Sequence, residues 1–187
     1  GCGKTTTIGM MLGLLKPTSG EILIDKKKIE ENRIETLKKI NFISPYIELP
    51  KKLSVKQNLI VYGKLYDVKD LNNRIEYLVE KLRLEELLNK ITGELSSGQK
   101  NRVSLAKALI NNPKVLLLDE PFAGVDLLSI QEIKGLLLKL QRRGCAVLVT
   151  DHNASQLLSV VDRAYVIANG SIVANGTPRQ IVNTAEA

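Results

Sequence analysis

Two apolar runs stand out in the second half of the chain, at 115–118 and 146–150. Neither run alternates polar and apolar positions, and such continuity is typical of strands buried on both faces of a parallel sheet. Asn169-Gly170 lies between two further β-prone segments and is a strong signal for a two-residue hairpin turn. The predicted strands are 21–24, 40–44, 115–118, 146–150, 164–168 and 171–174.

Apolar residues recur at spacings of three and four between these segments, and this spacing indicates helices. The first helix, at about 8–15, is apolar on nearly every face, so we expect it to be buried. Gly144 is the stop signal of a helix at 127–143, and Thr177-Pro178 is typical of the start of a last helix. The remaining helices are predicted at 35–39, 54–66, 71–90, from about Gln99 to Asn111, and at 154–161.

Strands and helices alternate at both ends of the chain, whereas the middle is helical. This order predicts an α/β fold with a mostly parallel sheet and an inserted helical subdomain. A length of 187 residues suits a single domain, 1–187. We expect 1–45 and 111–187 to form the α/β core and 46–110 to form the helical subdomain.

Composition narrows the function classes. The net charge of +7 comes from scattered lysines without interleaved aromatic residues, so no nucleic-acid partner is expected. No apolar stretch approaches the roughly 18 residues of a membrane span. Cys2 and Cys145 are the only cysteines and show neither pairing nor metal-ligand spacing, which fits a reducing cytosol.

The chain opens on Gly1-Cys2-Gly3-Lys4-Thr5-Thr6, which matches the end of the phosphate-binding motif G-x-x-x-x-G-K-[ST]. We expect the first glycine of that motif, and the strand that feeds it, to lie before residue 1, so that the chain is a fragment truncated inside the motif. Glycines let backbone N–H groups face a phosphate, and a lysine can reach the β- and γ-phosphate oxygens. The alternative is a glycine-rich turn before a core helix.

Three more polar motifs follow at the ends of predicted elements. Leu95-Ser96-Ser97-Gly98-Gln99 opens a helix, Asp119-Glu120 ends one apolar run, and Asp151-His152 follows the next. Ligands of open α/β sheets bind at the carboxyl ends of the strands, where a carboxylate can hold Mg²⁺. Glu120 points to the opposite side from Asp119 and can face a water. The alternatives are acids that cap a strand, a structural histidine and a plain helix cap.

With these motifs in this order, the chain resembles the ATP-binding subunit of an ABC transporter, a P-loop NTPase of RecA-like fold, over nearly all of its length. LSSGQ resembles the family's signature, LLLLDEP its Walker B motif, Ala123-Gly124-Val125-Asp126 its D-loop and Thr150-Asp151-His152 its H-loop. The resemblance implies ATP and Mg²⁺ as cofactors. It assigns metal binding to Thr5 and Asp119, and catalysis to Glu120 as base and to His152. It assigns ATP binding to Gly1, Cys2, Gly3, Lys4, Thr5 and Thr6. It also places Asp126 at the dimer interface and assigns contact with the ATP of an opposite subunit to Ser96, Ser97, Gly98 and Gln99.

The chain departs from the family pattern at one position. The Q-loop glutamine, counted back from Leu53-Ser54-Val55, falls on Pro45. Its loss puts metal coordination and coupling to the helical subdomain in question, and a catalytically weak ATP switch is therefore one alternative function.

The resemblance also implies partners and a location. It implies a second cassette and a transmembrane permease subunit that docks near residues 45–66, on the cytoplasmic side of the cell membrane. The stretch 59–66 resembles exporter cassettes. A soluble ABC-type ATPase that acts on ribosomes is the other alternative.

Overall fold

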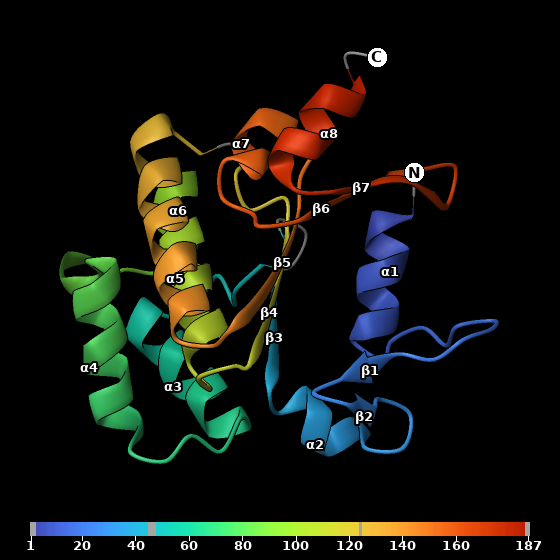
Figure 1. Ribbon diagram of the computed structural model, residues 1–187. Helices are drawn as coiled ribbons and strands as arrows, with labels where there is room; N and C mark the ends of the chain where they lie inside the picture. The colour runs from blue at the N-terminus through green and yellow to red at the C-terminus, as the bar shows by residue number, and fades with distance from the viewer. Residues whose placement is uncertain (1–2, 45–47, 124, 186–187) are drawn as a thin grey trace.

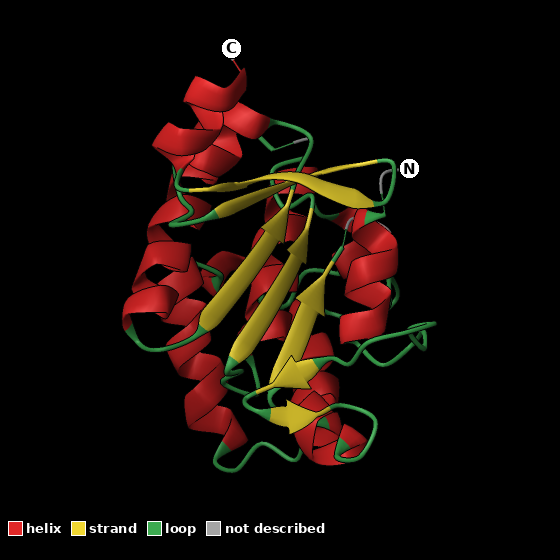
Figure 2. Ribbon diagram, turned by 45° about the vertical axis from the view of Figure 1, so that its right-hand side comes forward, coloured by secondary structure: helices red, strands yellow, loops and turns green. Residues whose placement is uncertain are grey.

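A computed structural model describes residues 3–44, 48–123 and 125–185 of the chain. Its centre is a parallel three-stranded sheet of order β3-β4-β5, formed by Ile40–Ile43, Val115–Asp119 and Ala146–Thr150. The two five-residue strands are in full register, from Val115 opposite Ala146 to Asp119 opposite Thr150. Figure 2 shows the three strands side by side and pointing the same way. All three strands were predicted, and their parallel pairing places their carboxyl ends at one edge. The prediction that 146–150 is buried is wrong, because Ala146 is exposed and the other residues of β5, which line a cavity, are only partly buried.

Helices cover both faces of this sheet (Figure 1). On one side lies α1 (Lys4–Met11), with α2 (Arg33–Leu37) below it. On the other side lie α3 (Val55–Leu65), α4 (Leu71–Leu82), α5 (Ser97–Leu109) and α6 (Leu127–Arg142). Two short 3₁₀ turns, Glu85–Leu87 and Thr92–Glu94, connect α4 to α5. This is the predicted α/β architecture with helical residues between β3 and β4.

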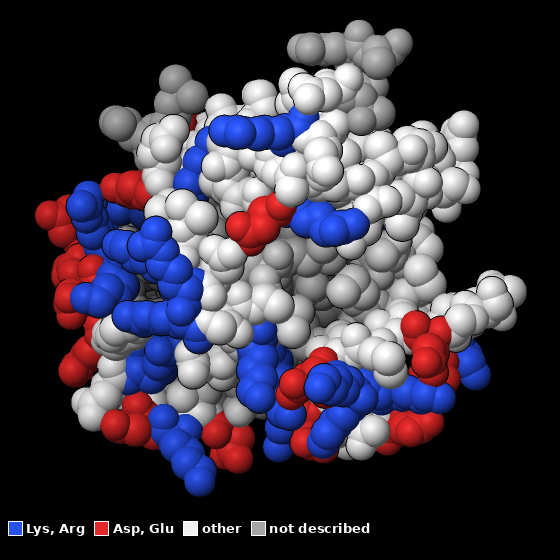
Figure 3. All heavy atoms as spheres, in the orientation of Figure 1, with Lys and Arg blue, Asp and Glu red and all other residues white. Residues whose placement is uncertain are grey.

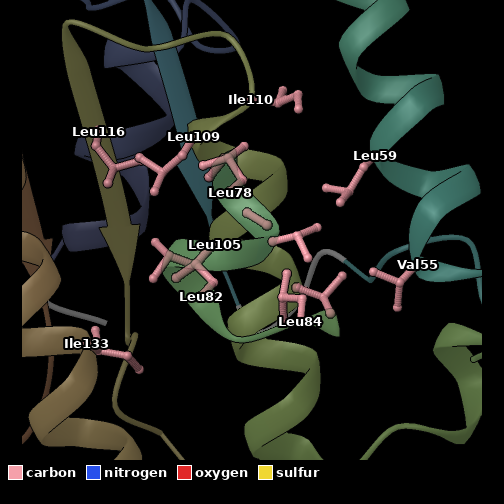
Figure 4. Packing of buried hydrophobic residues seen from close by; sticks show 14 of the residues in the cluster. Val55, Leu59, Leu78, Leu82, Leu84, Leu105, Leu109, Ile110, Leu116 and Ile133 are labelled. Atoms are coloured by element: carbon pink, nitrogen blue, oxygen red, sulfur yellow. The ribbon is translucent and has the colours of Figure 1, made fainter. Parts of the chain in front are cut away.

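The largest buried cluster joins the helices to the sheet (Figure 4). Val55 and Leu59 of α3 and Leu116 of β4 have no exposed surface. They pack with side chains from α4, α5 and α6, so one core holds the inserted helices against the strand that carries Asp119. Truncation of one such leucine to alanine typically costs about 2–5 kcal/mol of stability. The limits of 46 and 110 for a helical subdomain stay a prediction.

Several helix ends differ from the predictions. The helix predicted at 71–90 stops at Leu82, because Arg83 adopts a left-handed conformation with φ 52°. The first helix stops at Met11 and buries only Ile8 among the residues described, so the prediction of a wholly buried helix is wrong. Leu14 is 69% exposed. The left-handed Gly13, φ 63°, turns the chain before this leucine can continue the helix.

The remaining elements are small. Strands β1 (Leu23–Ile24) and β2 (Lys27–Lys28) form an unpredicted hairpin, because Asp25 and Lys26 both adopt positive φ and close a two-residue turn. Near the chain end lie α7 (Ala154–Leu158), shorter than predicted, and α8 (Pro178–Ala185). Among the described residues no helix is long and apolar enough to cross a membrane.

The predicted hairpin around Asn169-Gly170 is present as β6 (Ala164–Ala168) and β7 (Ser171–Gly176). It crosses the end toward which the parallel strands point (Figure 2). A cavity of about 590 Å³ separates β5 from β6, and its wall is mostly apolar. Lys4 and Ile8 of α1 also line this cavity, which places the start of α1 beside the carboxyl end of β5.

Candidate active site

The first helix begins at a glycine whose conformation other residues avoid. Gly3 has φ 104° and ψ 1°, and Lys4 is the first residue of α1. The carbonyl of Gly3 accepts hydrogen bonds from the backbone N–H and the hydroxyl of Thr7, both at 2.9 Å. Lys4 is partly buried, whereas Thr5 and Thr6 are exposed. The start of α1 therefore presents a lysine, two hydroxyls and the positive end of a helix dipole, which together suit an anion.

The end of β4 carries a buried carboxylate. Asp119 is only 3% exposed, and the hydroxyl of Thr150 donates a hydrogen bond of 2.6 Å to its Oδ1. This contact follows from the strand register, since Asp119 and Thr150 are opposite each other in the β4–β5 pair. The hydrogen bond fixes the carboxylate at the carboxyl edge of the sheet, where a nucleotide-bound cation would lie.

Glu120 leaves the strand in a left-handed conformation, with φ 49°. Its backbone N–H donates to the carbonyl of Thr150 at 2.8 Å, so the ladder continues one step beyond β4. A positive φ is uncommon for a non-glycine residue, and such strain is typical of functional sites. The Glu120 side chain is 26% exposed, so its carboxylate is held at the edge and remains open to solvent.

The single histidine completes this group. Nδ1 of His152 lies 3.8 Å from Oε1 of Glu120 and 3.6 Å from Oδ1 of Asp151. His152 is 67% exposed, whereas the Asp151 side chain is 1% exposed. Oδ1 of Asp151 accepts the backbone N–H of Asn153 at 2.9 Å, and Oδ2 is buried without a hydrogen-bond partner. A buried, anchored carboxylate thus sits directly beneath the imidazole.

The donor set fits a hard cation only in part. Carboxylate and hydroxyl oxygens, as on Asp119 and Thr5, are the ligands that Mg²⁺ prefers. Within the described residues no group of three or more His, Cys, Asp or Glu could hold a metal ion alone. Mg²⁺ is commonly bound through one or two carboxylates together with substrate phosphates. The residues present therefore fit a metal that arrives with a nucleotide.

The signature segment forms the cap of α5. Ser96 is the N-cap, its Oγ accepts the N–H of Gln99 at 3.3 Å, and its own N–H donates to Gln99 Oε1 at 3.0 Å. This reciprocal capping box satisfies two backbone donors. The N–H groups of Ser97 and Gly98 have no acceptor among the described residues. Two donors thus face outward at the positive end of a 13-residue helix.

The structure brings some of the predicted site residues together. Asp119, Glu120 and His152 lie at one edge of the sheet through the contacts above, with Lys4 near the end of β5. No hydrogen bond or ion pair within the described part joins Ser96–Gln99 to this edge. The signature residues therefore form no direct polar contact with this edge in the described part of the chain.

Among the remaining predicted residues, the structure describes Asp126. Asp126 is exposed, and its carbonyl accepts the N–H of Ile130 at 2.9 Å as α6 begins. Gly1, Cys2, Pro45 and Gly124 lie outside the described residues. The residue before Pro45, Ser44, is buried at the end of β3.

Thr150 and Asp151 were named within the H-loop resemblance, but no role was predicted for either residue. Matching the two five-residue strands end to end would have placed Thr150 opposite Asp119. Asp151 gave no comparable signal, because its burial depends on the loop after β5 rather than on a pattern of residues.

Comparisons with known proteins agree with this geometry. A family model described as "ABC transporter" matches residues 1–123. The lipopolysaccharide export system ATP-binding protein LptB of Haemophilus influenzae is 38% identical over 192 residues, which cover 98% of this chain and 78% of that protein.

Solved structures show the same fold. CbiO1 from Clostridium perfringens, part of the ABC transporter complex cbiONQ, superposes with a TM-score of 0.85 at 31% identity, covering 99% of this chain and 76% of that one. A dimeric ATP-binding cassette in a post-hydrolysis state, bound to ADP and Pi, gives a TM-score of 0.84 at 26% identity, covering 95% and 82%.

Proposed function

Because this chain belongs to the ABC transporter family as an ATP-hydrolysing, ATP-binding subunit, we propose that it powers export through ATP-driven pairing of two cassettes. The observation that carries the proposal is the edge of the sheet at which Asp119, Glu120 and His152 meet. The arrangement offers a metal ligand and a base from the end of β4, and a polar group that can contact phosphate from the end of β5.

In the proposed reaction, the N–H groups and the lysine at the start of α1 bind the β- and γ-phosphates. Asp119 and Thr5 would hold Mg²⁺, which would supply charge neutralisation for the phosphate oxygens. Glu120 accepts a proton from the attacking water, and general-base catalysis of this kind contributes about 10²–10⁴-fold in rate. His152 contacts the γ-phosphate, with Asp151 beneath it to orient the ring.

The signature cap supports the proposed pairing. The free N–H groups of Ser97 and Gly98 suit the γ-phosphate of an ATP held by the second cassette. ADP lacks that phosphate, so it cannot make these contacts. This differential affinity is what would let hydrolysis reopen the pair. The dimeric, ADP-bound relative supports the same arrangement.

We propose that the permease docks on the surface around a pocket of about 10 Å³ beside the end of β3. Phe42, Ser44, Leu49, Tyr62 and Lys107 line it. Nζ of Lys107 lies 5.1 Å from the centre of the Tyr62 ring and 3.4 Å from the carbonyl of Phe42. Burial lowers the pKa of this lysine. Residues of β3, α3 and the signature helix α5 therefore meet at this pocket. A permease helix bound here, on the cytoplasmic side of the membrane, would be displaced when α5 moves.

Export is the direction that the relatives support. A lipopolysaccharide export protein is 38% identical over nearly the whole chain. The permease subunits would select the transported substrate.

The test uses the complete gene carrying Glu120→Gln with an affinity tag in its native host. We expect ATP turnover to fall by about 10³-fold, because the base is replaced by an isosteric amide. We also expect MgATP to trap a dimer that co-purifies with a multi-span membrane protein. Glu76→Gln, on the exposed face of α4, is the matched control and should leave turnover unchanged.

Other outcomes would redirect the proposal. Ribosomal proteins in the purified complex would favour a soluble ATPase that acts on ribosomes. Wild-type turnover no higher than that of Glu120→Gln would favour a weak ATP switch, the function that Pro45 at the Q-loop position suggests. Unchanged turnover with no ATP-dependent dimer would contradict the assignment of Glu120.

A further inference from the structure

A cavity of about 780 Å³ opens at the edge of the sheet opposite the candidate active site. Val115 and Ala146, the first residues of β4 and β5, line its floor, and residues from α4 and α6 form its sides. Four residue steps along each strand, about 13 Å, separate this floor from Asp119 and Thr150. The cavity has the size of a small-molecule site, typically about 300–1,000 Å³.

The wall of this cavity is strongly basic. Its cationic side chains are Arg74, Lys81, Lys114, Lys139 and Arg143, and Asp25 is the one carboxylate among the lining residues. Figure 3 shows lysine and arginine side chains gathered on the left of the face in view, over α4 and the end of α6. The net charge of +7 is therefore concentrated unevenly, with a large share around one hollow.

Most of these charges lack an acidic partner. Lys81 pairs with Glu80 at 2.6 Å, and Lys114 pairs with Asp25 at 3.4 Å. Within the described residues no salt bridge reaches Arg74, Lys139 or Arg143, and Lys139 has no hydrogen bond either. Like charges that converge without a counter-charge raise the free energy of the empty cavity, and a bound anion would lower it.

A tyrosine holds this group in place. The Tyr77 ring lies under the Arg74 guanidinium at 5.4 Å and near Lys81 Nζ at 5.7 Å, and Arg143 donates a hydrogen bond to the Tyr77 hydroxyl. Arg74 also donates to the carbonyls of Leu109 and Ile110 at the end of α5. Arg74 and Arg143 are thus oriented before any ligand arrives.

Arg74 donates to the end of α5 and Arg143 donates to Tyr77, whereas Lys139 has no hydrogen bond or salt bridge within the described residues. Burial lowers the pKa of the Arg74 guanidinium, and the nearby charge of Arg143 acts in the same direction.

We propose that this basic cavity binds a small soluble molecule that carries two or more phosphate groups. Arginine forks match phosphate oxygens in geometry, and several cations in one hollow call for several negative charges. A hollow, rather than a flat face, favours a compact ligand over a membrane surface. The proposal does not depend on the proposed export function.

The test is calorimetric titration with tripolyphosphate, without nucleotide or metal, on the Lys4→Ala background so that the phosphate site at α1 does not contribute. We expect the background protein to bind, and Lys139→Gln with Arg143→Gln to weaken binding by at least about tenfold through loss of two charge-assisted contacts. Lys64→Gln with Lys90→Gln removes the same charge from exposed positions elsewhere and should change affinity by less than about twofold.

Three results would overturn the proposal. One is an absence of binding on the Lys4→Ala background. Another is an equal loss in both double variants, which would mean general attraction to a basic protein. The third is binding to phosphatidylglycerol–phosphatidylcholine vesicles but not to tripolyphosphate, which would identify lipid headgroups as the source of phosphate. Circular dichroism and thermal melting establish that each variant is folded, and ATP hydrolysis of the Lys139/Arg143 variant in the otherwise wild-type protein should be unchanged.

Discussion

Helices α3 and α5 have the same kind of N-terminal cap, but the surroundings of the two N-termini differ. Ser54 and Ser96 are both N-caps, and each forms a reciprocal capping box with a glutamine three residues on. At α3 the next two N–H groups, of Val55 and Lys56, donate to the carbonyls of Lys90 and Leu88 at 3.0 and 2.9 Å. At α5 the corresponding groups have no acceptor among the described residues.

A buried polar network explains the closed end of α3. Asn58 is fully buried, and its amide donates to the carbonyls of Pro50 and Ser54 and to the hydroxyl of Thr92. That hydroxyl in turn donates to Pro50 at 2.7 Å. No such network covers Ser96 and Ser97 within the described part of the chain, and both residues are exposed. The cap of α3 thus stabilises the fold, whereas the cap of α5 leaves two N–H donors that we propose bind a ligand.

The largest effect on ATP hydrolysis is expected from an acidic residue introduced in the first turn of α5. Gly98→Glu places a carboxylate where we expect the γ-phosphate of a second cassette, so ATP hydrolysis and ATP-dependent dimerisation should fall by roughly 100-fold. Lys56→Glu, at the equivalent position of α3, should leave both unchanged. Both substitutions favour the helix dipole, so unfolding should not explain the difference.

Mixing variants sharpens this result. A Gly98→Glu chain paired with a Lys4→Ala chain would contain one composite site with both defects and one intact site. With random pairing, we expect recovery of about a quarter of the wild-type turnover. No recovery on mixing would contradict the head-to-tail arrangement and would place the signature and the lysine of one and the same chain at a single ATP.

A smaller effect is expected from Asn58→Ala, measured by urea unfolding. Loss of this amide leaves buried carbonyls unsatisfied, which should cost about 1–3 kcal/mol of stability. ATP affinity should change only in proportion to the unfolded fraction. A stability change below about 0.5 kcal/mol would show that water replaces the amide and that the start of α3 is less enclosed than the structure indicates.

The smallest effect is expected when the N-cap serine of either α3 or α5 is replaced by alanine. Ser54→Ala and Ser96→Ala each remove one side-chain acceptor and should cost about 1 kcal/mol of stability. Only Ser96→Ala should also weaken ATP-dependent dimerisation, by analytical ultracentrifugation. Equal dimerisation in the two variants would mean that Ser96 acts only as a cap.

Much of the fold could be predicted from pattern alone, with failures at turns. Strands β4 and β5 and the Asn169-Gly170 hairpin lie where predicted because continuous apolar runs and two-residue turns are local signals. The burial of β5 was predicted wrongly, since its residues are exposed or only partly buried. The end of α4 could not be predicted, because Arg83 takes a left-handed conformation that its residue type does not favour. Helix lengths at α1 and α7 were also overestimated, since both helices end before the apolar spacing does.

The sequence by itself determined the order of the motifs, the family to which the chain belongs, and the position of Asp119 and Glu120 at the end of a buried strand. These are properties of residue type and spacing along the chain. Only the tertiary structure decided that Thr150 holds Asp119, that Asp151 lies buried under His152, and that five cations converge on one hollow. Each of these depends on strand register or helix packing between residues far apart in the chain, and no local pattern encodes such distances.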